Sequence, residues 1–116
     1  MRKEAENLLA AFLKRERNRD QLTICMDRIL TAAERCFDQI PEKTRQGLHA
    51  GQDIDWHPNG FRGPVISLEQ FEVELSALVK KALKESNDTA TLLSFGVGLN
   101  SLVNYLQKII INIDRQ

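Results

Sequence analysis

Apolar residues recur in alternating steps of three and four along three segments of the 116-residue chain, and this spacing constrains the fold more than any other feature. Such a period places the residues on one face of an α-helix. Because all three segments share it, the predicted fold is all-α, a small antiparallel bundle of about four helices packed at shallow angles. The apolar positions are Ala5, Leu8, Phe12, Leu22, Met26, Ile29, Ala33, Cys36 and Ile40 in the first segment, Leu68, Phe71, Leu75, Leu78 and Ala82 in the second, and Leu92, Phe95, Leu99, Leu102, Leu106, Ile109 and Ile113 in the third.

The first segment contains a break, because two arginines occupy apolar positions of its register. One unbroken helix over residues 2–40 would be ~58 Å long at about 1.5 Å per residue. A compact domain of this size is only about 35 Å wide. We therefore predict two helices, with Asn18 or Asp20 capping the second, which ends before Pro41. The alternative is one extended helical arm, which a dimer could support.

The start of the next helix has the clearest local signal in the chain. Ser67 is a suitable N-cap, and Gln70 stands where a capping box requires it. Ile66 before the cap can pack on Phe71 as a hydrophobic staple. The polar run "ESNDTAT" then separates this helix from the last one.

Length and composition indicate a single all-helical domain over residues 1–116. A chain of this length buries roughly two thirds of its unfolded surface, so a core can form without disulfides. Its 42% apolar and 28% charged residues are typical of a globular protein. The formal net charge of zero gives no indication of a strongly acidic or basic partner.

Two features favour the cytoplasm. The N-terminal residues include Glu4 and Glu6 and lack the long apolar run and cleavage site of a secretory signal. Cys25 and Cys36 would lie ~16 Å apart on one helix, too far for a disulfide with each other. We expect two reduced cysteines in the core, as is usual in a cytoplasmic protein.

The last predicted helix, which extends to about Ile113, has no charged residue from Thr89 to Gln107. Its many amides and hydroxyls argue against a membrane span, because each would need a partner in lipid. Its two glycines are costly in a helix interior, which suggests that another backbone comes close. Close packing within one bundle and a subunit interface both explain them. The candidates for self-association are Gly96, Gly98, Asn100 and Asn104.

A long irregular connection, at about residues 41–66, holds all three prolines, both histidines and four of the six glycines. Connections this long are usually functional or disordered. This one is too apolar for a solvated linker, so we expect it to be ordered, with at least one of Trp56 and Phe61 largely buried. We expect "HPNGF" to form a turn with Pro58 at its first corner, the second residue of the turn. Side chains that face outward would form a partner-binding patch, and the candidates are Trp56, His57, Phe61 and Arg62.

A basic cluster offers an alternative site. Residues 1–19 carry six basic and three acidic side chains, which could contact phosphates. A solvated charged face is the commoner meaning of such a run. The candidate residues for nucleic-acid binding are Lys14, Arg15, Arg17 and Arg19.

The histidines and nearby carboxylates do not form a recognisable chemical site. His49, Asp53, Asp55 and His57 match no metal-ligand spacing. The pair Asp55 and His57 has no nucleophile or anion-holding loop beside it. We therefore expect no metal, no cofactor and no catalytic residues.

These features favour a non-enzymatic protein-interaction or regulatory module of the inhibitor, immunity, adaptor or small-subunit type. The expected partners are another protein and, through the last helix, a second copy of the chain. One alternative is a nucleic-acid-binding regulator that uses the basic N-terminal segment. A less favoured alternative is a small enzyme acting at the loop 49–62.

Overall fold

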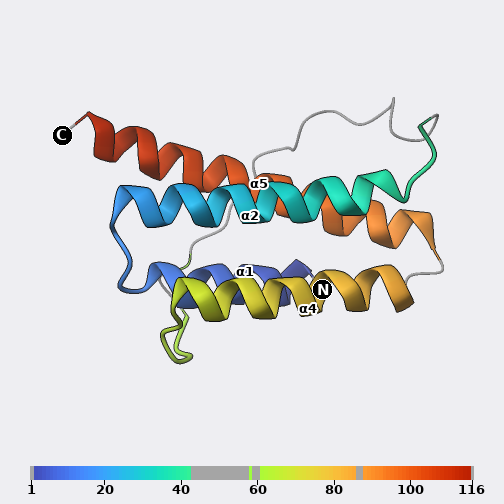
Figure 1. The fold of residues 1–116 in the computed structure, drawn as a ribbon, viewed down its shortest axis with the longest axis horizontal. Helices are drawn as coiled ribbons and strands as arrows, with labels where there is room; N and C mark the ends of the chain where they lie inside the picture. The colour runs from blue at the N-terminus through green and yellow to red at the C-terminus, as the bar shows by residue number, and fades with distance from the viewer. Residues whose placement is uncertain (1, 43–57, 59–60, 86–87, 116) are drawn as a thin grey trace.

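The computed structural model describes residues 2–42, 58, 61–85 and 88–115. This described part contains four helices and no strand, which confirms the predicted all-α bundle (Figure 1). Its dimensions are 42 × 28 × 23 Å. The helices are α1 (Arg2–Leu13), α2 (Arg19–Asp38), α4 (Leu68–Glu85) and α5 (Thr89–Asp114).

The predicted break in the first segment is confirmed. Helix α1 ends at Leu13, whose carbonyl oxygen accepts a hydrogen bond from Nη1 of Arg17 at 2.6 Å. Helix α2 begins after Asn18, whose side chain accepts hydrogen bonds from the backbone N–H groups of Asp20 and Gln21 at 2.9 and 3.2 Å. These contacts satisfy backbone groups that a helix end leaves without partners.

The starts of α4 and α5 are also capped by side chains. Ser67 Oγ accepts a hydrogen bond from the backbone N–H of Gln70 at 3.1 Å, as predicted, and α4 follows. Asp88 caps α5 by accepting from the backbone N–H of Ala90 at 3.0 Å. Ile66 and Phe71, the two residues of the predicted staple, are both buried in the same core.

The four helices form two layers, α2 with α5 and α1 with α4 (Figure 1). Helices α1 and α5 run in one direction, whereas α2 and α4 run in the other. Each layer is therefore an antiparallel pair, while α2 packs parallel to α4 and α1 parallel to α5 across the layers. Because α2 ends at one end of the bundle and α4 begins at the other, the connection between them must return along the molecule. This topology explains its length.

The core follows the predicted register with two informative differences. The rings of Phe12 and Phe71 pack with centroids 5.7 Å apart between α1 and α4. In α1, however, Leu9 is fully buried and Leu8 is only half-buried. In α5, Ser101 is buried, although its polar side chain suggested a position outside the core. Its hydroxyl donates to the carbonyl of Val97 at 3.2 Å.

Candidate functional site

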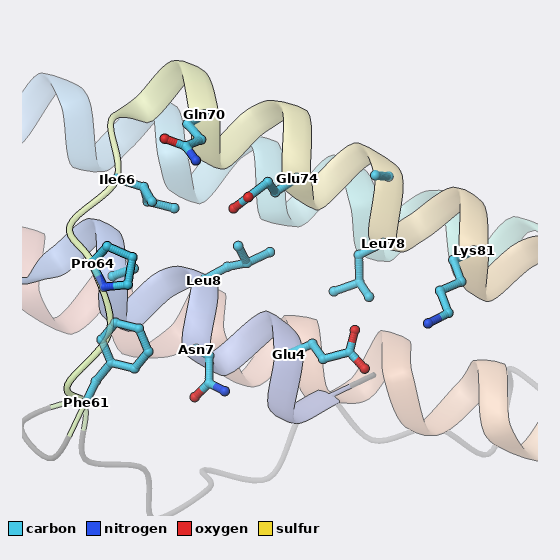
Figure 2. A pocket seen from close by; sticks show the side chains of 12 residues that line it. Glu4, Asn7, Leu8, Phe61, Pro64, Ile66, Gln70, Glu74, Leu78 and Lys81 are labelled. Atoms are coloured by element: carbon cyan, nitrogen blue, oxygen red, sulfur yellow. The ribbon is translucent and has the colours of Figure 1, made fainter.

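A groove with a volume of about 540 Å³ lies between α1 and α4 (Figure 2). We call it the α1/α4 groove. The two helices that flank it form the layer of the bundle that packs against α2 and α5. Its lining consists of Glu4, Asn7, Leu8, Ala11, Phe61, Pro64, Ile66, Gln70, Glu74, Ala77, Leu78 and Lys81.

Helical spacing brings these residues into the groove. From α1, the lining residues stand at steps of three, one and three, so they share one side of the helix. From α4, the stripe from Gln70 to Lys81 does the same and faces the first stripe. The apolar side chains Leu8 and Leu78 lie between the helices, and the polar side chains stand at the margins. The groove therefore has an apolar floor and a polar rim.

The segment before α4 closes one end of the groove (Figure 2). The backbone N–H of Ile66 donates to the carbonyl of Ala11 at 3.4 Å, and Lys14 Nζ donates to the carbonyl of Gly63 at 3.3 Å. The ring of Phe61 folds over Gly63 so closely that a Cβ atom there would overlap it. Glycine at this position thus allows the aromatic ring to stand at the end of the groove.

Of the four partner-binding candidates, the structure describes Phe61 and Arg62. Phe61 is half-buried and lines the groove, whereas Arg62 is exposed and does not. Trp56 and His57 lie outside the described residues, as do the other residues weighed for metal binding or catalysis. The turn hydrogen bond joins the N–H of Phe61 to the carbonyl of Pro58 at 3.1 Å. Pro58 is therefore the first residue of this turn, whereas the prediction placed it second, at the first corner.

The self-association candidates divide into two buried and two partly exposed residues. A Cβ added to Gly96 would lie 2.8 Å from Cε1 of Phe37, and one added to Gly98 would lie 3.0 Å from Cγ of Arg2. Both glycines therefore leave room for side chains of the same chain, which are the nearest atoms to each of them. Asn100 and Asn104 instead face outward in part.

These two asparagines belong to a stripe along the outer side of α5. Its members follow one another at steps of four, three, four and seven, and each is partly or fully exposed. The most exposed is Ile111, at 41%. We call this charge-free set the outer α5 stripe, and it consists of Leu93, Val97, Asn100, Asn104 and Ile111.

Three residues of the basic cluster make contacts within the chain. Lys14 donates to the carbonyl of Gly63, as noted above, and Arg17 donates to the carbonyls of Leu13 and Glu16. Arg19 pairs with Asp114 at 2.5 Å, an interaction that raises the pKa of the guanidinium and joins the start of α2 to the end of α5. Only Arg15 of the four is exposed without an ion pair or side-chain hydrogen bond to the described residues.

The two cysteines are free and buried, as predicted. Burial raises the pKa of the Cys25 thiol, and the charge of Glu72 adds to the rise. Burial also raises the pKa of Cys36 to about 11, against the opposing effect of Arg35. Both thiols are therefore protonated near neutral pH and are poor nucleophiles.

Sequence reasoning did not identify the α1/α4 groove. The signal was present in "NLLAAFL", residues 7–13, where six of seven residues are apolar. That apolar face is wider than packing against a single neighbour requires.

Comparisons with protein-family models, with curated proteins and with solved structures found no match.

Two further searches of the described residues were negative. None of the helices there has the length and apolar character needed to cross a membrane. No group of three or more His, Cys, Asp or Glu side chains is placed to hold a metal ion in that part of the chain.

Proposed function

We propose that this protein is a non-enzymatic protein-interaction module whose α1/α4 groove holds a segment of another protein. The observation that carries the proposal is the form of the groove, with an apolar floor, a polar rim and an end closed by Phe61 and Pro64. A partner that covers such a floor gains roughly 25 cal/mol for each Å² of apolar surface removed from water. The polar rim gives the partner a defined position.

The chemistry of the lining favours binding over catalysis. No cysteine, serine, threonine or histidine is among the described residues that line the groove. Its charged groups, Glu4, Glu74 and Lys81, come from both helices and stand at the margins, where they can orient a partner. The proposed class remains that of small inhibitor, immunity, adaptor or subunit proteins.

The test uses two arginine substitutions on the same helix. Ala77 is exposed and lines the groove, so Ala77→Arg should obstruct it without disturbing the core. Val73 is 65% exposed and does not line the groove, so Val73→Arg is the matched control. Proteins captured on the immobilised chain are quantified for the wild type and both variants.

We expect to capture partners that bind the wild type and Val73→Arg equally well. Their binding to Ala77→Arg should be weaker by roughly tenfold or more, because the arginine obstructs the centre of the site. Circular dichroism and thermal unfolding verify that both variants keep the fold. Capture that is equal for Ala77→Arg and Val73→Arg would assign the interaction to another surface and reject the proposal.

A second interaction is favoured by the outer α5 stripe. We propose that the chain also self-associates through this surface, because its five members are uncharged and partly apolar and the exposed Lys108 stands only at its edge. When a surface meets its own copy across a twofold axis, each charge meets a like charge nearby, so the absence of charge removes that repulsion. Gly96 and Gly98, which were also candidates for this role, are buried and do not belong to the outer α5 stripe.

Nucleic-acid binding is the less supported alternative. Lys14, Arg17 and Arg19 are engaged within the chain, which leaves Arg15 as the exposed cation of the cluster with no such contact among the described residues. A phosphate-binding surface normally uses several cations and shows a steep salt dependence. Gel shifts with DNA and RNA at two salt concentrations are the direct test. Binding that weakens with salt and with Arg15→Glu would favour this alternative.

A further inference from the structure

We propose that the occupant of the α1/α4 groove is an amphipathic helix of the partner protein, with an apolar stripe on one side and a lysine or arginine that faces Glu74. This inference rests on the proposed function and specifies the partner's chemistry. It follows from the secondary structure around the groove, from the length of its two stripes and from the charges on its rim.

The elements around the groove exclude two other common modes of peptide recognition. Addition of a β-strand needs an exposed sheet edge, and the described part of the chain has no strand. Recognition of a polyproline segment relies on a groove lined by several aromatic rings, and among the described residues of the lining Phe61 alone is aromatic. Binding of a helix requires only an apolar channel between elements, which α1 and α4 provide.

The length of the groove fits a short helix. The α1 stripe from Glu4 to Ala11 spans ~10 Å, and the α4 stripe from Gln70 to Lys81 spans ~16 Å, at about 1.5 Å per residue. These lengths correspond to roughly two to three helical turns. A helix of that length presents apolar residues at i, i+3 or i+4, and i+7, enough to cover the floor.

The two ends of the groove differ, which sets how the helix lies (Figure 2). At the closed end, Phe61, Pro64 and Ile66 surround the space with apolar surface, suited to a large apolar side chain of the partner. At the other end, Glu4 and Lys81 stand on opposite helices. The apolar anchor of the partner should therefore point toward the closed end.

Charge selects a basic residue on the partner. Glu74 lies between the two ends on α4, is exposed, and its carboxylate points over the groove. The exposed carboxylate of Glu74 attracts a cationic side chain at the edge of the partner's apolar stripe. An acidic helix would meet like charges instead.

The experiment uses a phage-displayed library of random peptides about 16 residues long, roughly four helical turns. The folded full-length protein is the target, and peptides are retained only if they bind the wild type and Val73→Arg but not Ala77→Arg. Retained peptides are sequenced and synthesised. Their affinities are measured by fluorescence anisotropy, and their helicity by circular dichroism with and without the protein.

We expect the retained peptides to share apolar residues at i, i+3 or i+4, and i+7, to carry a flanking lysine or arginine and to gain helicity on binding. Glu74→Lys should weaken binding by roughly two- to tenfold, as expected for an ion pair at an exposed rim. Replacing the peptide's lysine by glutamate should restore affinity for Glu74→Lys. Glu69→Lys, on the same helix but outside the groove lining, is the control and should change affinity little.

Different failures separate this inference from the proposed function. If no peptide depends on the groove, the proposed function itself fails. Groove-dependent peptides that contain proline, stay non-helical or prefer acidic flanks leave the binding site in place but overturn the helical, basic partner. A wild-type homodimer that Ala77→Arg dissociates would assign the groove to a second copy of the chain and would also overturn it.

Discussion

Leu8 and Leu9 show how one position in the sequence separates core from binding surface. Both are apolar neighbours in "NLLAAFL", and the predicted register placed Leu8 in the core. The structure buries Leu9 completely and leaves Leu8 half-buried at the floor of the α1/α4 groove. A helix turns by about 100° per residue, so a small rotation of α1 decides which leucine faces the core.

The two glycines of α5 give a matched pair for stability. Gly98→Ala should raise the free energy of unfolding by about 0.5–1 kcal/mol, because alanine favours the helix and the atoms it would approach belong to the exposed side chain of Arg2. Gly96→Ala should give no gain or a loss, because its Cβ would lie 2.8 Å from the ring of Phe37, which packs against the core. Urea unfolding measures both changes.

An equal gain for the two substitutions would mean that the ring of Phe37 yields as easily as the side chain of Arg2. Far-ultraviolet circular dichroism at matched concentrations provides the control that neither change alters helix content. The comparison also tests whether these glycines serve packing within one chain. If Gly98 were a dimer contact, the effect of Gly98→Ala on the free energy of unfolding would depend on protein concentration.

At the scale of helices, the boundaries were predictable because their signals are local. Asn18 and Ser67 each accept a hydrogen bond from a backbone N–H within the next three residues, so a short stretch of sequence contains the whole interaction. Pairing of helices is not local. The apolar stripes of α2 and α4 would suit either direction, and only the way the long connection returns makes these helices parallel.

The candidate site was less predictable than the helices. Phe61 was identified from its own irregular segment, whereas Gln70, Glu74 and Lys81 look like ordinary surface positions of a helix. Their role depends on α1 lying beside α4, a contact between residues some 60 positions apart in the chain, such as Phe12 with Phe71. The pattern of residues within one helix does not show which other helix will lie beside it.

Removal of the α2 cap tests the break between the first two helices. Asn18→Ala should lower the free energy of unfolding by about 1 kcal/mol, because two backbone N–H groups lose their acceptor. Asn18→Asp keeps an acceptor oxygen at the same place, and its charge suits the helix N-terminus, so it should preserve stability. Chemical denaturation of the three proteins makes the measurement. Equal stability of Asn18→Ala and the wild type would contradict the assigned cap.

At the scale of the whole molecule, the topology separates two surfaces that could bind at the same time. The α1/α4 groove belongs to one layer of the bundle, and the outer α5 stripe belongs to the other (Figure 1). A dimer formed through α5 would therefore leave two grooves open. Such an arrangement suits a module that presents two copies of one binding site, and avidity would follow if a partner carried two helices.

Self-association through the outer α5 stripe predicts a species of twice the 13.2 kDa chain mass in sedimentation at micromolar concentration. Asn104→Arg should dissociate it, because the twofold relation brings the new charge near its own copy in a surface that has no carboxylate in the stripe to neutralise it. Val73→Arg on α4 adds the same charge in the other layer and should leave the dimer intact. Ala77→Arg should also leave the dimer intact while it weakens binding at the groove. Self-association through the outer α5 stripe would be contradicted if the wild-type chain sediments as a monomer at these concentrations. It would also be contradicted if the chain forms a dimer that Asn104→Arg does not weaken.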